Sequence, residues 1–258
     1  MSYPGLELNG KTAVVVGGSS GIGRAIAIAL AQAGADVIPS ARRSEQVAAA
    51  AAEIQSLGRR SLTLTCDVAD DSSLRRLLQA AVAEFGKVDI MVYAAGITKR
   101  LPTLEMSDQD WDAILDTNLK GAFHACNIFG GHMLERRSGR IITIGSLSSF
   151  LGLFQVAAYA ASKAGLAGLT RSLAVEWAPY NVCVNAIVPG VFRTALNQNM
   201  LDGTARGQEL LQRTPMKRFG RVEELAGLAI FLASDSAGFV TGAVIPVDGG
   251  FLASGVNQ

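Results

Sequence analysis

Short hydrophobic runs alternate along the chain with longer segments in which Ala and Leu recur at helical spacing. Because such alternation is typical of βαβ units, it predicts a parallel sheet with helices between the strands. The predicted strands are residues 12–16, 35–39, 61–65, 88–94, 139–145, 182–189 and 243–250. The predicted helices are residues 23–34, 44–58, 72–86, 107–136 and 156–178, with a further helical pair between 190 and 243.

The predicted strands are almost continuously apolar, as expected when helices cover both faces of a sheet. No low-complexity linker interrupts the alternation. The pattern therefore predicts one doubly wound α/β domain over residues 1–258, with a seven-stranded parallel sheet and helices on both faces.

The composition agrees with a globular enzyme-sized domain, since 49% of the 258 residues are hydrophobic and 17% are charged. A formal net charge of +1, without a long basic run, gives no general attraction for nucleic acid or an acidic membrane. The chain starts without a signal-like segment and has no stretch of 18 uncharged apolar residues. We expect a cytoplasmic protein whose partner is a small molecule, not a membrane or nucleic acid.

The cysteines and histidines do not indicate a metal site. Cys66, Cys126 and Cys183 are odd in number and far apart, which fits buried free thiols better than a disulfide framework. His124 and His132 match no usual ligand spacing. We expect no metal.

A glycine-rich turn, "VGGSSGIGRAIA", follows the first predicted strand and opens the first helix. Glycine in this position permits a tight turn and lets the backbone approach a pyrophosphate, while the helix N-terminus offers free N–H groups. A purely structural turn would have the same composition, but its place in the first βα unit favours a dinucleotide site of the Rossmann type. The residues expected to contact the cofactor here are Gly17, Ser19, Ser20, Gly21, Ile22 and Gly23.

The end of the second strand indicates which dinucleotide binds. An Asp or Glu would favour NAD(H), but the chain has Ala41, Arg42 and Arg43 there. A guanidinium suits a 2'-phosphate, so we predict NADP(H) over NAD(H), with Arg42 as the principal contact. The alternative is that both arginines are only solvated at a helix start. Asp67 and Val68, after the third strand, are placed to flank an adenine, although Asp67 is equally suited to cap the following helix.

The stretch "YAASK" sets Tyr159 and Lys163 four residues apart, and by itself this is a common arrangement of neighbours on one helix face. Ser146 in "IITIGSLSS" stands thirteen residues before Tyr159. Together with the glycine turn, "CDV", "DTNLKG", "VNAIVPG" and "PVDGG", this order resembles the short-chain dehydrogenase/reductase family from about residue 11 to residue 250.

The resemblance implies roles for specific residues. Tyr159 would be the general acid/base, and Lys163 would lower its pKa and reach the nicotinamide ribose. Ser146 would hydrogen-bond the substrate oxygen, and Asn118 would hold a water that connects Lys163 to solvent. Family members are usually homotetramers. The further cofactor contacts implied are Ala95, Gly96, Tyr159, Lys163, Pro189, Gly190, Val191 and Thr194.

Two positions depart from the family pattern. Val16 stands where the family often has Thr, and "YAAG" at residues 93–96 stands where it often has N-N-A-G. The missing Asn side chains would ordinarily brace the sheet near the adenosine site. Neither position performs the chemistry, so these departures bear on stability, on adenosine affinity and on the packing around Tyr93.

The substrate is less sharply defined than the chemistry. Residues 192–220 are a polar, amphipathic excursion that is expected to form a substrate lid or, alternatively, a solvated helical hairpin. Lys99, Arg100 and Arg193 are candidate partners for a carboxylate, although each is also suited to face solvent. Within the family the chain most resembles the gluconate 5-dehydrogenase and 2-deoxygluconate 3-dehydrogenase group. The alternatives are a 3-oxoacyl-[acyl-carrier-protein] reductase and a catalytically silent NADPH-binding regulator.

Overall fold

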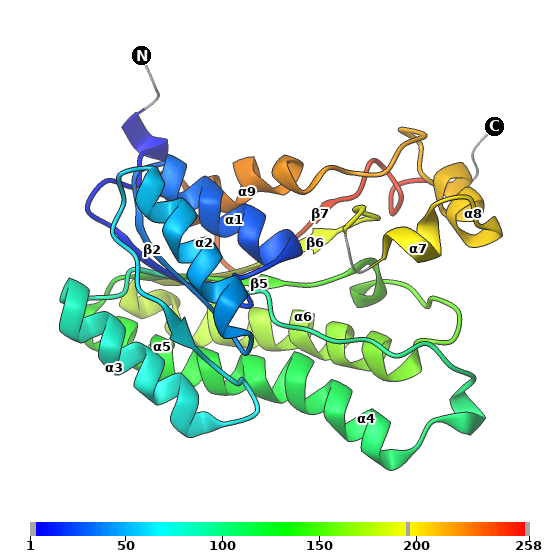
Figure 1. Cartoon of the computed structure of the whole chain (residues 1–258), viewed down its shortest axis with the longest axis horizontal. Helices are drawn as coiled ribbons and strands as arrows, with labels where there is room; N and C mark the ends of the chain where they lie inside the picture. The colour runs from blue at the N-terminus through cyan, green and yellow to red at the C-terminus, as the bar shows by residue number, and fades with distance from the viewer. Residues whose placement is uncertain (1–3, 195–196, 256–258) are drawn as a thin grey trace.

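The computed structural model describes residues 4–194 and 197–255, which form a three-layer structure with a central parallel sheet (Figure 1). The strand order is β3-β2-β1-β4-β5-β6-β7, and each neighbouring pair is parallel. The predicted seven-stranded doubly wound fold is confirmed. The strands are β1 (Thr12–Val16), β2 (Asp36–Ala41), β3 (Leu64–Thr65), β4 (Ile90–Tyr93), β5 (Gly139–Ile144), β6 (Val182–Pro189) and β7 (Val244–Val247).

Helices cover both faces of the sheet and enclose two hydrophobic cores. In Figure 1, α1, α2 and α9 lie above the sheet, whereas α3, α4, α5 and α6 lie below it. The helices of the first layer are α1 (Gly21–Gln32), α2 (Ser44–Ser56) and α9 (Ala226–Ala233). Those of the second are α3 (Asp71–Phe85), α4 (Asp108–Leu115), α5 (Gly121–Arg136) and α6 (Ala157–Trp177).

Two regions differ in detail from the predicted helices. The expected single helix over 107–136 contains a π-helical turn, Asp116–Lys120, between α4 and α5. The segment between β6 and β7 contains α7 (Gln198–Leu201) and α8 (Ala205–Arg213) in addition to α9, where the sequence predicts only a pair. Both differences arise because an extra residue in a turn, or one short turn of helix, scarcely changes the hydrophobic pattern.

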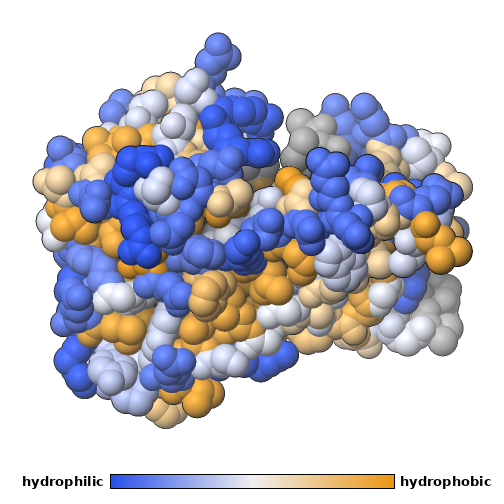
Figure 2. Space-filling view, turned by 90° about the horizontal axis from the view of Figure 1, so that it is seen from below, coloured by the Kyte–Doolittle hydropathy of each residue, from blue (hydrophilic) through white to orange (hydrophobic). Residues whose placement is uncertain are grey.

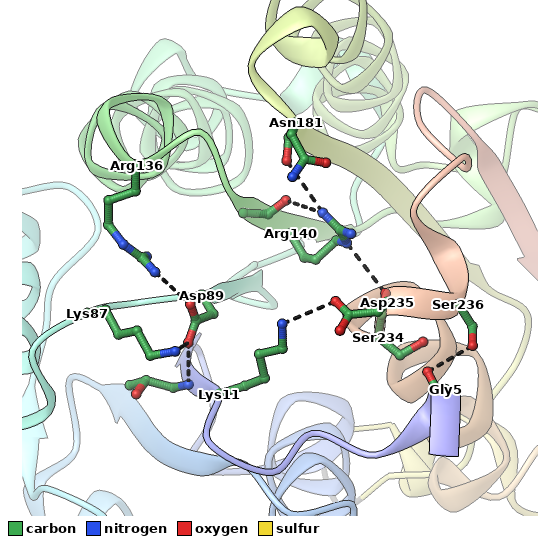
Figure 3. A network of polar contacts seen from close by, with 12 residues as sticks. Gly5, Lys11, Lys87, Asp89, Arg136, Arg140, Asn181, Ser234, Asp235 and Ser236 are labelled. Atoms are coloured by element: carbon green, nitrogen blue, oxygen red, sulfur yellow. Dashed lines mark hydrogen bonds and ion pairs between the residues drawn. The ribbon is translucent and has the colours of Figure 1, made fainter. Parts of the chain in front are cut away.

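The amino edge of the sheet is held by a network of ion pairs (Figure 3). The buried carboxylate of Asp89 accepts hydrogen bonds from the Thr12 amide at 3.0 Å and from Arg136 at 2.9 Å, and it forms an ion pair with Lys87 at 3.0 Å. Lys11 pairs with Asp235 at 3.1 Å. Because both carboxylates at this edge are paired with cations, we read it as a structural edge, and the opposite, carboxyl edge is where ligands bind in folds of this kind.

Candidate active site

The glycine turn lies where the strand order reverses, between β1 and its neighbours β2 and β4. Gly17 has φ of +85°, and a Cβ there would lie 2.5 Å from the Ala95 amide nitrogen. A Cβ on Gly23 would lie 2.1 Å from the Gly17 carbonyl oxygen. The turn therefore requires glycine at both positions, and it brings the start of α1 close to the loop after β4.

The arginines after β2 lie beside this turn. Arg42 and Arg43 are both exposed, and Arg43 donates from Nη2 to the Ser20 hydroxyl at 3.2 Å. The structure thus brings Arg43 and Ser20, two of the predicted cofactor residues, into contact. Arg42, the predicted principal contact, has no ion pair with any described residue.

Asp67 and Val68 follow the carboxyl end of β3. The Asp67 carboxylate accepts from the Ala69 amide at 3.1 Å, whereas α3 is capped by Asp70, which accepts from Ser72 N at 2.9 Å. The capping role considered for Asp67 therefore belongs to Asp70. Val68 is buried beside it.

Gly96 lies against the predicted catalytic residues, because a Cβ there would be 3.5 Å from Lys163 Nζ and 3.4 Å from Asn118 Oδ1. The residue that follows, Ile97, is clamped by Asn118: its amide donates to Oδ1 at 2.8 Å, and its carbonyl accepts from Nδ2 at 2.9 Å. Nδ2 also donates to the Ser162 hydroxyl at 3.0 Å. Asn118 thus fixes the loop after β4.

Asn118 is completely buried and lies in the π-helical turn. Single π turns inside helices are frequent at functional sites, because the extra residue re-aims a side chain. The sequence predicted a role for Asn118 but did not predict the π-helical turn that carries it.

Tyr93, one of the two departures from the family pattern, supports the same turn. Its ring is completely buried, and its hydroxyl donates to the Thr117 carbonyl at 2.5 Å. Burial strongly raises the pKa of the phenol, so it remains a donor. The unusual Tyr93 therefore braces the residue next to Asn118.

Ser146, Tyr159 and Lys163 meet at the carboxyl end of β5. The Ser146 side chain is close enough to the Tyr159 phenol to oppose in part the rise that burial causes in its pKa, and Lys163 Nζ lies 5.7 Å from the centroid of the Tyr159 ring. Lys163 is 4% exposed and donates to the Ile144 carbonyl at 2.8 Å. A phenol, a second hydroxyl and a buried ammonium therefore lie near one another at this edge of the sheet.

Burial shifts the pKa values of both Tyr159 and Lys163. Burial raises the pKa of Tyr159, and the Ser146 side chain only partly opposes this. Burial also lowers the pKa of Lys163 to about 8.

Ser149 is a supporting residue that the sequence analysis missed. Its hydroxyl accepts from the Ser146 amide at 3.3 Å and donates to the Lys163 carbonyl at 2.9 Å. It therefore ties the loop of Ser146 to the helix that carries Tyr159 and Lys163. Nothing distinguishes it from Ser148 in the sequence "SLSS", so only the structure reveals this link.

The loop after β6 supplies the last group of predicted cofactor residues. Pro189 ends the strand, and a Cβ on Gly190 would lie 2.6 Å from the Asp248 Cα. A Cβ on Gly21 would have Thr194 Cγ2, at 3.9 Å, as its nearest neighbour. The loop after β6 thus approaches the glycine turn, and open space remains beside Gly21. A hollow of about 410 Å³ borders Val191 in this loop, but its lining includes neither Tyr159 nor Lys163.

The three candidate substrate cations differ in their surroundings. Lys99 pairs with Asp110 at 2.7 Å, and Arg193 pairs with Asp202 through Nε at 3.0 Å and through Nη2. Arg100 pairs with no carboxylate among the described residues, and its guanidinium carbon lies 5.7 Å from the Phe154 ring centroid. Arg100 is therefore the candidate whose charge is left for a ligand.

Over residues 4–194 and 197–255, no cluster of three or more His, Cys, Asp or Glu side chains is arranged to hold a metal ion. Within the same part of the chain, no helix combines the length and the apolar character needed to cross a bilayer. The three cysteines are buried and free.

A doubly wound sheet with Asn118, Ser146, Tyr159 and Lys163 beyond its carboxyl edge defines a dinucleotide-dependent oxidoreductase. A family model described as "Enoyl-(Acyl carrier protein) reductase" matches residues 16–252. With this match and the full-length relatives described next, the chain belongs to the short-chain dehydrogenase/reductase family.

Three comparisons show what the chain is similar to. It is 40% identical to 2-dehydro-3-deoxy-D-gluconate 5-dehydrogenase of Escherichia coli, over 98% of this chain and 100% of that one. It is 41% identical to D-threitol dehydrogenase of Mycolicibacterium smegmatis, over 95% and 94%. The structure of a gluconate 5-dehydrogenase of Burkholderia cenocepacia in complex with NADP and tartrate superposes with a TM-score of 0.93, at 36% identity over 97% of this chain and 98% of that one.

Proposed function

We propose that this protein is an NADP(H)-dependent oxidoreductase that transfers a hydride between the nicotinamide and a secondary alcohol or ketone of a sugar acid. The observation that carries the proposal is the convergence of Ser146, Tyr159 and buried Lys163 beside Gly96. The names of the relatives from Escherichia coli and Burkholderia cenocepacia, which act on gluconate-type acids, support the substrate class.

The chain's own residues hold and move the proton. Bound NADP(H) supplies or accepts the hydride. In the direction of reduction, the Tyr159 hydroxyl donates its proton to the substrate oxygen, which Ser146 holds by a hydrogen bond. The Lys163 ammonium stabilises the phenolate that remains, and Asn118 keeps the loop at Ile97 in place.

The cofactor residues fit NADP(H). The glycine turn leaves space at Gly21 beside the N-terminus of α1, where a pyrophosphate would bind. The exposed guanidinium groups of Arg42 and Arg43 support binding of a 2'-phosphate, and residue 41 is alanine, so no carboxylate at that position would repel it. We expect Arg42→Ala and Arg43→Ala each to raise the KM for NADPH with little effect on NADH. Equal efficiency of the wild-type enzyme with NADH, together with an unchanged KM in both variants, would contradict this assignment.

The substrate is tested by following NADPH and NADP absorbance with aldonates, neutral polyols, diketones and acetoacetyl thioesters. We expect turnover of aldonates or their keto forms. Turnover of thioesters alone would favour the 3-oxoacyl-[acyl-carrier-protein] reductase function. A Tyr159→Phe variant that is as active as the wild type in every assay would favour a silent NADPH-binding regulator, whereas we expect it to lose turnover and to keep cofactor binding.

Residues 192–220 are proposed as the lid over the substrate, in a single domain that spans residues 1–258. Residues 195 and 196 of this segment lie outside the described residues; in the rest of it, Arg193 pairs with Asp202, and Thr204 caps helix α8. Limited proteolysis with and without NADP and substrate tests this, because a lid that closes should become protected.

The assembly is proposed to be a cytoplasmic homotetramer. Trp111, Phe123 and Val175 are exposed on α4, α5 and α6, and Val175 is 80% accessible. Figure 2, which looks onto this side of the molecule, shows hydrophobic residues gathered near its middle. Such a face is expected to pair with a second copy across a two-fold axis. Sedimentation of the wild type and a Val175→Glu variant would test whether this face forms the interface.

A further inference from the structure

Two buried threonines face each other between the strand that leads to Ser146 and the helix that carries Tyr159 and Lys163. Thr143 lies on β5, and Thr170 lies on α6, below the sheet in Figure 1. Their exposed fractions are 1% and 0%, and their hydroxyl oxygens are 2.9 Å apart. The proposed proton transfer uses neither hydroxyl, and a polar pair buried here costs desolvation unless its hydrogen bond is kept.

The direction of this hydrogen bond follows from a second one. The Thr170 hydroxyl donates to the Leu166 carbonyl at 2.9 Å, one turn earlier on α6. Because a hydroxyl carries one proton, Thr170 accepts from Thr143 and not the reverse. The two hydroxyls therefore form a directed chain from the strand to the backbone of the helix, in which each proton has an acceptor.

Lys163 is the point at which α6 is held most firmly. Its Nζ donates to the Ile144 carbonyl on β5 at 2.8 Å, and its own carbonyl accepts from the Ser149 hydroxyl at 2.9 Å. Thr170 follows Lys163 on the same helix, about 10 Å further along its axis. The threonine pair is therefore a second attachment of α6 to β5, separate from the one at Lys163.

The hydrogen bond holds the two side chains closer than an apolar contact would. Hydroxyl oxygens at 2.9 Å are well inside the ~3.5–4.0 Å at which carbon atoms pack. Methyl groups in place of both hydroxyls would thus push α6 away from β5 at Thr170 by about 0.6–1.1 Å. With Lys163 as the pivot, ~10 Å from Thr170 and ~6 Å from Tyr159, this tilt moves Tyr159 by about half an ångström.

We infer that the Thr143–Thr170 hydrogen bond sets the spacing of β5 and α6, and that both threonines are positioning residues for the proton transfer by Tyr159. The inference rests on the proposed function, because it concerns the distance between Tyr159 and the substrate oxygen held by Ser146. A misplacement of about 1 Å can cost about a hundredfold in rate, so half that displacement should lower kcat about tenfold.

Valine has nearly the shape of threonine, so Thr143→Val, Thr170→Val and the double variant remove the hydroxyls one at a time and together. Each single substitution leaves a buried polar group without its partner and should lower the Tm. The double variant replaces the pair by two apolar groups, which is nearly neutral for stability, so its Tm should return toward that of the wild type. Its kcat should nevertheless stay about tenfold low, with a smaller change in KM.

Two further variants separate position from stability. Thr170→Ser keeps the hydroxyl and loses a buried methyl group, so its kcat should remain close to that of the wild type although its Tm falls. Thr12→Val is the matched control, because Thr12 is 3% exposed and lies at the amino end of β1, and its kcat should be unchanged. All kcat values are measured well below the lowest Tm of the set.

A kcat that recovers together with the Tm in the double variant would overturn the inference, as would a kcat that falls with the Tm in Thr170→Ser. The substrate is whichever compound of the panel above is turned over, so failure with aldonates rejects the sugar-acid substrate and leaves this comparison intact. A crystal structure of the double variant needs no turnover. Tyr159 displaced relative to Ser146 would support the inference, and α6 in its wild-type position would overturn it.

Discussion

Replacing Tyr93 by phenylalanine removes one hydroxyl and leaves the ring that fills the core. The hydroxyl is buried and is bonded to the Thr117 carbonyl inside the π-helical turn. Gly121 makes room for it, because a Cβ there would lie 2.6 Å from the hydroxyl oxygen. The substitution therefore tests one hydrogen bond without creating a large cavity.

The expected loss follows from the carbonyl that remains. A buried acceptor left without its partner costs about 1–3 kcal/mol, and for a chain of this size each kcal/mol lowers the Tm by about 2–4 °C. We therefore expect the Tm of Tyr93→Phe to fall by about 4–8 °C for a loss of ~2 kcal/mol. Because Thr117 precedes Asn118, kcat should fall more than KM changes.

The assay is thermal unfolding by calorimetry, with steady-state kinetics on the same samples. Tyr180→Phe is the control, since Tyr180 is 43% exposed and its ring contacts Arg137 at the surface. A Tm within about 1 °C of the wild type for Tyr93→Phe would refute the bracing role. A double-mutant cycle with Gly121→Ala sharpens the test, because the clash of the new methyl group should be smaller when the hydroxyl is absent.

Three further predictions concern the cofactor turn, the catalytic lysine and the amino edge. Gly23→Ala should abolish measurable NADP binding in calorimetry, because its Cβ would lie 2.1 Å from the Gly17 carbonyl oxygen; retained affinity would show that the turn can shift. Since the pKa of Lys163 is lowered to about 8, kcat for ketone reduction should fall as pH rises through about 8, and a profile flat across this range would contradict its role. Burial would raise the pKa of Asp89, but bonds from Arg136 and other donors lower it below its usual 3.8. The stability that the Asp89 carboxylate contributes is therefore present above pH 3.8 and is lost as the pH falls below it. At neutral pH, the unfolding free energy of Asp89→Asn should be lower than that of the wild type by about 1–3 kcal/mol. It should also change less between neutral and acidic pH than the unfolding free energy of the wild type.

The sheet could be predicted from the sequence because its strands are nearly unbroken apolar runs. β1 is buried at all five positions and β6 at all eight, so the hydrophobic pattern alone locates them. The glycine turn was equally visible, since positions such as Gly17 tolerate no side chain. The order of Ser146, Tyr159 and Lys163 then identified the family.

The π-helical turn could not be predicted, because a single inserted residue does not disturb helical periodicity over residues 107–136. The packing of Tyr93 depends on this turn, so its hydrogen bond to Thr117 was equally hidden. Ion pairing was hidden for a different reason. Lys99 and Arg193 find carboxylates eleven and nine residues further along the chain, and such contacts depend on loop conformation that the residue pattern does not encode.

The amino and carboxyl edges of the sheet differ in how their polar groups are paired. At the amino edge, donors surround the Asp89 carboxylate, and the Lys11 ammonium forms an ion pair with Asp235, so neither group requires a ligand. Beyond the carboxyl edge, the Arg206 Nε and the Ser148 hydroxyl are buried without a hydrogen-bond partner among the described residues. Among the described residues, Gln46 Oε1 on α2 and Ser61 Oγ before β3 are also buried without a hydrogen-bond partner, so such groups are not confined to this edge. Charge pairing separates the candidate substrate residues more clearly, since the sequence offered Lys99, Arg100 and Arg193 as equals and, among the described residues, the structure leaves only Arg100 of the three without a carboxylate partner.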